Sequence, residues 1–260
     1  MPLDRTTNFP NGATNAGPSQ TMAAAGVQDP SFAHIFHDDF DIFNATDWTI
    51  TIIGAGTASL VAGDGGILQL LTSGATTDSL FVQAKTATYT CTLGKDLFFK
   101  ALVASTDDTL SDIFYAGLMG ITTTPLTATN GIWLSKANGI QTWQLNIAVA
   151  GVLRTFPFNT ISPKMLPGPY MEVGFHQDYL GNIEAFCNPT TGPEWANLGP
   201  LSTSTNPVPM TNRGRVAYVP AETAALNIPV GNLAVSFGLQ DGNASSHNMQ
   251  VDYITAVKHR

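Results

Sequence analysis

Apolar and polar residues alternate in short bursts along most of the chain, from about residue 35 to the C-terminal end. A period of two is typical of strands that bury one face, because successive side chains of a strand point to opposite sides of the sheet. No sustained period of 3.6, which would indicate helices, is present. The alternation and the intervening turn residues predict strands at 35–43, 48–53, 67–71, 79–84, 88–92, 97–105, 113–121, 131–136, 141–149, 152–158, 170–177, 182–187, 215–219, 233–239 and 249–257. So many short strands predict an all-β chain with two packed antiparallel sheets.

Two of the turns predict which strands pair. Ala150 and Gly151 separate two alternating segments by only two residues, which predicts a tight hairpin. Residues 179–182 carry a glycine followed by an asparagine and mark a second hairpin.

The first 33 residues show neither period. We interpret residues 1–33 as an extended arm that becomes ordered only against another surface, and residues 34–260 as the sandwich. A tail without a role is the alternative. The apolar residues of the arm are spaced like separate anchors rather than along one helix face: Phe9, Met22, Val27 and Phe32.

Prolines interrupt the strand rhythm between residues 188 and 230. Each proline removes a hydrogen-bond donor and stops a central strand, so this segment is expected to leave the sandwich as a long excursion. Loops of this length usually serve binding or assembly. Trp195 lies in the excursion and is interpreted as a loop anchor or an interface residue.

Charge is scarce in this sequence. The 260 residues carry 11 Lys plus Arg against 19 Asp plus Glu, for a net charge of −8. Such a chain has no basic field to neutralise phosphates, which argues against nucleic acid as a partner. The apolar runs are far shorter than the ~20 residues that cross a bilayer, so no membrane helix is expected. The N-terminus lacks the pattern of a secretory signal, which favours an intracellular origin.

Cys91 and Cys187 are the two cysteines of the chain, and each falls in or beside a predicted strand. Domains that depend on disulfides use many more cysteines, so both are expected to be free thiols that pack as small apolar side chains. A disulfide between the two is the alternative.

The two ends of the body carry the most specific pattern. Residues 36–40 (Phe-His-Asp-Asp-Phe), Trp48 and residues 65–70 resemble the opening strands of a concanavalin-A-like jelly roll, and residues 249–257 resemble its last strand. The resemblance covers about residues 34–260. It implies an antiparallel two-sheet jelly-roll sandwich in which the last strand pairs with the first. The superfamily includes lectins, glycan hydrolases, laminin-G-type modules and phage virion proteins, so the resemblance implies a fold more than a function.

The alternation in the last strand assigns its side chains to two faces. Val251, Tyr253, Thr255 and Val257 are expected on one face, and Asp252, Ile254 and Ala256 on the other.

Enzymes of this fold need catalytic residues that the sequence does not supply. Glycan hydrolysis uses two carboxylates that flank the bond, and the laminarinase-type motif E-x-D-x-E is absent. Glu172 and Glu184 fall on neighbouring predicted strands and are interpreted as ordinary strand positions. A lyase would need His, Tyr and Arg together, for which His176, Tyr170 and Arg154 are the nearest set. We therefore expect no enzymatic activity.

Metal-binding patterns are weak. Asp38, Asp39 and Asp41, with Asp252 on the expected partner strand, form the one grouping that could bind calcium, and solvated carboxylates are the alternative. The five histidines are scattered and no zinc set is completed. No metal and no cofactor is predicted.

Tryptophans could offer stacking platforms to a sugar. Trp143 shares a strand face with Leu145 and Ile147, and Trp133 lies between two apolar residues, so both are interpreted as packing residues. Trp195 is the least readily explained as a core residue, because it lies in the proline-rich excursion.

The resemblance, the arm, the excursion and the low charge together suggest a bacteriophage capsid decoration, or cement, protein. Its partners would be the major capsid protein and copies of itself, as a trimer by fold analogy. It would be made in the host cytoplasm and sit on the capsid exterior. The alternative is a carbohydrate- or receptor-binding, lectin-like module of a fibre or spike, with a glycan as partner.

Overall fold

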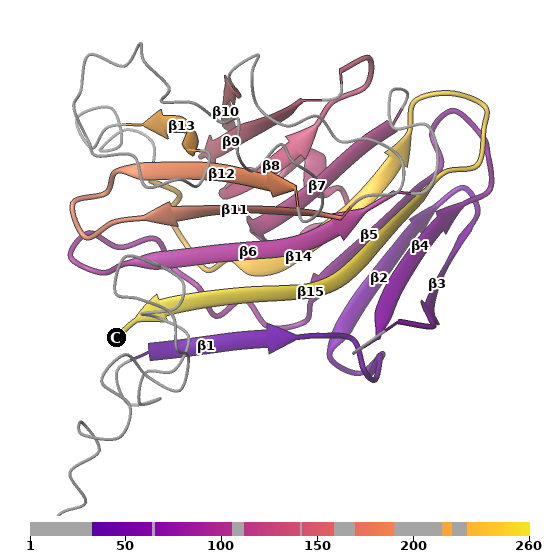
Figure 1. Cartoon of the computed structure of the whole chain (residues 1–260). Coiled ribbons are helices and arrows are strands. Elements are labelled where there is room, and N and C mark those ends of the chain that lie inside the picture. The colour runs from indigo at the N-terminus through magenta and orange to yellow at the C-terminus, as the bar shows by residue number, and fades with distance from the viewer. Residues whose placement is uncertain are drawn as a thin grey trace, which may run out of the picture.

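Two antiparallel β-sheets packed face to face make up the protein (Figure 1). The computed structural model describes residues 33–63, 66–105, 112–140, 142–158, 170–189, 215–219 and 228–260. The predicted all-β jelly-roll sandwich is confirmed. The predicted arm anchors, Phe9, Met22, Val27 and Phe32, and Trp195 of the excursion lie outside the described residues.

One sheet has eight strands in the order β13-β12-β11-β6-β15-β4-β3, with β1 also paired to β15. Their bounds are β1 Ala33–Asp38, β3 Gly56–Val61, β4 Ile67–Thr72, β6 Leu97–Ala104, β11 Met171–Gln177, β12 Ile183–Pro189, β13 Arg215–Val219 and β15 Asn248–His259. The pairing of β1 with β15 confirms the expected contact between the first and last strands of the body.

The other sheet has seven strands in the order β10-β9-β8-β7-β14-β5-β2. Their bounds are β2 Trp48–Ile53, β5 Ser79–Ala84, β7 Asp112–Met119, β8 Gly131–Lys136, β9 Trp143–Val149, β10 Val152–Pro157 and β14 Ala234–Asp241. A single 3₁₀ turn in the described part, η1 Pro125–Thr127, lies in the β7–β8 connection.

The hairpin between β9 and β10 follows its prediction. Val149 and Val152 pair directly, so Ala150 and Gly151 form the two-residue turn. Both turn residues have positive φ, 50° for Ala150 and 84° for Gly151. A turn with two positive φ values matches the right-handed twist of the strands it joins, and glycine accepts that geometry without strain.

The core lies between the two sheets. Large apolar side chains from both sheets are fully buried in one cluster, including Phe99 and Phe175 of the eight-stranded sheet and Trp143, Leu145 and Phe237 of the seven-stranded sheet. Trp143 therefore packs in the core with Leu145, as expected from their shared strand face.

Four predictions about strands need correction. The strand predicted at 35–43 ends at Asp38, and residues 39–43 form no strand. Residues 56–61, where no strand is predicted, form edge strand β3. Residues 88–92 form no strand and contribute one bridge, between Tyr89 and Leu233. In β15 the register with β6 shifts between Val251 and Tyr253.

The shift in β15 is a β-bulge, and it changes which residues share a face. Because the extra residue reverses the alternation, Val251 points into the core with Ile254 and Ala256, and all three are fully buried. Tyr253 and Thr255 lie on the outer face instead. The predicted grouping of Val251 with Tyr253 was therefore wrong.

Candidate functional site

The outer face of the eight-stranded sheet gathers aromatic and charged side chains on neighbouring strands. Strand register places Phe186 of β12, Gly174 of β11, Lys100 of β6 and Thr255 of β15 in one row across the sheet. Glu172 and Tyr253 lie in the adjacent row. We call the set Lys100, Glu172, Phe186 and Tyr253 the outer polar face.

A charged pair occupies the middle of this face. The Lys100 ammonium lies 3.1 Å from Glu172 Oε2, and the two side chains are 24% and 19% exposed. The Tyr253 hydroxyl donates to the same oxygen at 2.6 Å. Lys100 Nζ also lies 5.1 Å from the centre of the Tyr253 ring, within the range of a cation–π interaction. These contacts hold the tyrosine ring and the carboxylate in fixed positions while leaving them partly accessible to solvent.

Phe186 forms a second aromatic surface, and Gly174 makes room for it. A Cβ atom on Gly174 would lie 2.4 Å from Phe186 Cζ and 3.0 Å from Lys100 Cβ. The phenylalanine ring therefore lies across the glycine beside the Lys100 stem. Sequence analysis missed this pair, although a glycine inside a strand often marks such a close approach.

A histidine-rich corner adjoins the outer polar face. Asp96 pairs with His176 Nε2 at 3.3 Å and with His259 Nδ1 at 3.1 Å. The ring of His176 stacks on Phe98 at 4.2 Å. Burial lowers the pKa of His176, and the hydrogen bond and charge of Asp96 oppose that shift.

The two glutamates considered for catalysis do not form a close pair. Strand pairing sets Glu184 opposite His176, four residues along β11 from Glu172. At about 3.3 Å per residue, the two positions are separated by about 13 Å. Carboxylates in glycosidases are about 5–9.5 Å apart, so this spacing does not match either geometry.

The lyase-type set is not brought together. His176 pairs with Asp96, whereas the Tyr170 hydroxyl donates to Gln250 Oε1 at 3.2 Å. Arg154 lies on β10, at the edge of the other sheet.

The four aspartates considered for calcium do not converge. Asp38 accepts hydrogen bonds from the Phe40 backbone N–H at 2.9 Å and from Trp48 Nε1 at 3.2 Å, so its carboxylate fixes the chain after β1. Asp39 and Asp41 are exposed. Across the described ranges, the metal-type cluster that does form consists of Asp112, Asp241 and His247 instead.

The tryptophans in the described ranges are buried. Trp48 and Trp143 belong to the core between the sheets. Trp133 packs against Tyr115 and Met119 in a separate cluster and is 2% exposed. The expectation that Trp133 and Trp143 are packing residues is therefore confirmed.

Both cysteines are free thiols. Burial raises the pKa of each thiol to about 12. Little thiolate would form at neutral pH, which agrees with the expected role as small apolar side chains.

Comparison with known proteins is informative at the level of the fold. No protein-family model and no curated protein matches the sequence. Among solved structures, a protein of unknown function from Shewanella oneidensis MR-1 superposes with a TM-score of 0.60 at 9% identity, over 95% of each chain. Lectin UEA-II in complex with galactose gives 0.55 at 9% identity, over 87% of this chain and 99% of the lectin.

An endo-1,3-β-glucanase from Streptomyces sioyaensis gives a TM-score of 0.54 at 11% identity, over 89% of this chain and 98% of the enzyme. The fold is that of a concanavalin-A-like jelly roll. At such low identity the likeness extends to the fold alone, which lectins and glycan hydrolases share. Among the described residues, no helix is long and apolar enough to cross a membrane.

Proposed function

We propose that this chain is a non-enzymatic carbohydrate-binding module that holds its ligand on the outer polar face. The proposal rests on one observation. The Lys100–Glu172 ion pair lies on a partly exposed sheet surface that also presents the aromatic rings of Phe186 and Tyr253. Ligand sites combine apolar or aromatic surface with a few fixed polar groups, which set orientation and specificity. Apolar C–H faces of a sugar ring would lie on the aromatic rings, and its hydroxyls would reach Lys100 and Glu172.

Two further points support a binding module over an enzyme. The Glu172–Glu184 spacing of about 13 Å is too wide for a catalytic pair. Glu172 also already accepts from Tyr253 and pairs with Lys100, and the same carboxylate can accept sugar hydroxyls.

The test is a glycan array followed by titration of the best ligand by calorimetry. Phe186→Ala is expected to weaken binding at least about tenfold, equal to about 1.4 kcal/mol, because the stacking surface is lost. Tyr179→Ala is the matched control, since Tyr179 is an exposed aromatic in the β11–β12 turn, off the outer polar face. Its affinity is expected to equal that of the wild type.

Three outcomes would contradict this function. The first is a wild-type chain that binds no glycan, and the second is equal affinity for the Phe186→Ala and wild-type chains. The third is release of sugar products by the wild type that is abolished in Glu172→Gln, which would identify an enzyme.

A second candidate function is shell assembly, as in the capsid decoration protein expected from the sequence. One observation favours it. Edge strands β2 and β3 follow one another in the chain, and residues 48–61 contain no charged side chain. Ile52, Ile53 and Leu60 on these edges are 46%, 40% and 42% exposed. Natural sheet edges usually carry charge or proline that blocks pairing, as β10 does with Arg154 and Pro157.

We assign a second copy of this chain as the occupant of the β3 edge. Thr57→Lys, which places a charge on the exposed side of β3, is expected to convert an oligomer into a 27.5 kDa monomer in mass photometry. Thr123→Lys, on an exposed bend outside both edges, is expected to leave the oligomer intact. A wild-type chain that is monomeric at every concentration, or an oligomer that persists in Thr57→Lys, would exclude this interface.

A further inference from the structure

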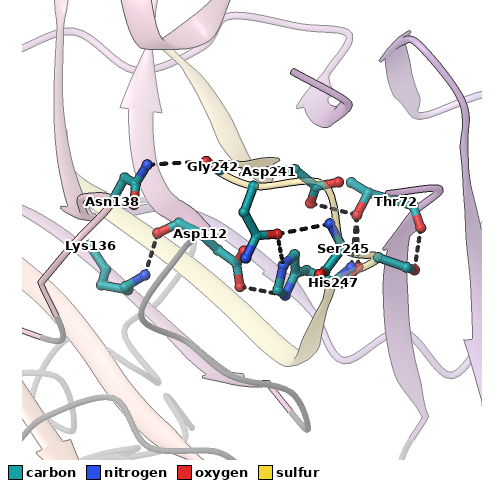
Figure 2. A network of polar contacts seen from close by, with 10 residues as sticks. Thr72, Asp112, Lys136, Asn138, Asp241, Gly242, Ser245 and His247 are labelled. Atoms are coloured by element: carbon teal, nitrogen blue, oxygen red, sulfur yellow. Dashed lines mark hydrogen bonds and ion pairs between the residues drawn. The ribbon is translucent and has the colours of Figure 1, made fainter. Parts of the chain in front are cut away.

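A buried polar cluster lies at one end of the seven-stranded sheet (Figure 2). Asp112 begins β7 and Asp241 ends β14, and strand pairing places the two residues directly opposite each other. His247 lies at the end of the segment that crosses from β14 to β15 in the other sheet. Thr72, the last residue of β4, completes the contact between the two sheets.

The acidic and basic members of this cluster are removed from water. Asp112 is fully buried, Asp241 is 1% exposed and His247 is 3% exposed. Taking two carboxylates out of water is unfavourable unless charge and hydrogen bonds compensate. Burial accordingly raises the pKa of the Asp241 carboxyl, although the Thr72 hydrogen bond opposes the shift.

Hydrogen bonds fix the proton positions on His247. The side-chain oxygen of Asn243 accepts the Ser245 backbone N–H at 2.8 Å, which identifies it as an acceptor. His247 Nε2 lies 2.8 Å from the same oxygen, so Nε2 carries a proton and donates. In a neutral imidazole the other nitrogen, Nδ1, then holds a lone pair.

That lone pair faces a carboxylate. His247 Nδ1 lies 3.1 Å from Asp112 Oδ2, so two electron-pair donors oppose each other between buried side chains. The contact requires either a proton shared by the pair, on the imidazole or on the Asp112 carboxyl, or a metal cation.

Asp241 supplies the observation that favours a metal. Its Oδ1 accepts the Thr72 hydroxyl at 2.6 Å, which fixes the orientation of the carboxylate. Its other oxygen, Oδ2, is buried and has no partner within hydrogen-bond geometry, although the Gly74 backbone N–H is close enough to act on the carboxyl and to lower its pKa. One proton on His247 would hydrogen-bond to Asp112 and would leave Asp241 Oδ2 without a partner. A cation bound by all three residues would compensate both carboxylates.

We propose that Asp112, Asp241 and His247 form a binding site for a divalent transition-metal ion, with Zn²⁺ as the best match. One ligand atom from each residue lies within 4.8 Å of the others. Zinc binds imidazole nitrogen and carboxylate oxygen at about 2.0–2.2 Å, so the three side chains would draw together on loading. A single imidazole nitrogen among the ligands disfavours calcium, which prefers six to eight oxygens.

The surroundings match those of metal ligands in other proteins. Asn243 orients the imidazole through Nε2–H, and Thr72 orients the Asp241 carboxylate, which is the usual arrangement behind a metal site. The buried Lys136 ammonium donates to the backbone carbonyl of Asp112, and its positive charge lowers the affinity of the site for a cation. Because the ligands come from β7, β14 and the crossing to β15, the ion would join the two sheets.

The test uses the full chain, stripped with a chelator and then titrated with ZnCl₂ by calorimetry. We expect one zinc per chain and a rise in Tm of about 5 °C at saturation. His247→Gln is expected to weaken binding at least about tenfold and to lose the rise in Tm. His176→Gln, which alters a histidine elsewhere in the fold, is the matched control and is expected to bind like the wild type.

A spectroscopic measurement on the wild type covers the case in which His247→Gln fails to fold. Co²⁺ in this site is expected to give the intense visible bands of a tetrahedral ion without a thiolate charge-transfer band, because neither cysteine contributes. A thiolate band, or no zinc binding by the wild-type chain, would overturn the proposal. The latter result would mean that a proton alone joins His247 to Asp112.

Discussion

Gly117→Ala is expected to lower the free energy of unfolding by about 3 kcal/mol or more in urea denaturation. Gly117 of β7 pairs with Trp133 of β8. A Cβ atom on Gly117 would lie 2.4 Å from the Ile132 carbonyl oxygen and 2.4 Å from Trp133 Cα. Both are backbone atoms of a paired strand, so the clash can be relieved only by separating β7 from β8 and losing ladder hydrogen bonds.

Gly120→Ala is the matched control for this prediction. Gly120 follows β7 directly, and a Cβ atom there would meet one atom, the Asn130 carbonyl oxygen, at an ordinary 3.5 Å. Its stability is expected to match that of the wild type within about 1 kcal/mol. Equal unfolding midpoints for Gly117→Ala and Gly120→Ala would show that β7 and β8 are not paired in this register.

Lys136→Met is expected to cost about 3–5 kcal/mol of stability, measured by urea denaturation in the presence of a chelator. Lys136 is fully buried, donates to the Asp112 backbone carbonyl and lies 5.4 Å from the centre of the Phe114 ring. Methionine retains most of the volume but removes the cation, so the buried carboxylates of Asp112 and Asp241 lose a compensating charge. The chelator prevents an added metal ion from replacing that charge.

Lys85→Met separates this effect from the general loss of a lysine. Lys85 is exposed, and its ammonium donates to the Ala45 carbonyl at 3.1 Å. A change of no more than about 1 kcal/mol is expected there, because water replaces the lost contact. If both variants were equally stable, Lys136 would not be compensating buried charge, and the electrostatic description of the cluster would fail.

The sequence by itself determined the strands and the class of fold. The strand bounds predicted at 48–53, 79–84, 131–136 and 215–219 match the structure. Alternation explains 48–53, where Trp48 is buried and Thr49 exposed, whereas every residue of 79–84 and 131–136 is buried, so those strands were readable as short apolar runs between turns. Hairpin turns such as Ala150-Gly151 were readable for a similar reason, since their backbone geometry restricts the residues that can form them.

Only the tertiary structure decided the faces and the sites. The bulge near Asp252 reverses the alternation in β15, and an uninterrupted pattern of polar and apolar residues gives no sign of it. The ring of Phe186 lies on Gly174 because β12 pairs with β11 in one register.

Register between distant strands likewise explains why the sequence carries no sign of the Asp112–Asp241–His247 cluster. Asp112 and Asp241 come together because β7 and β14, far apart in the sequence, pair directly, and the crossing to β15 brings His247 against them. Periodicity reports whether a side chain points inward, which is a local property of the backbone. Which inward-pointing side chains meet depends on the pairing of strands that are remote in the chain, and that pairing is set by packing of the whole sandwich.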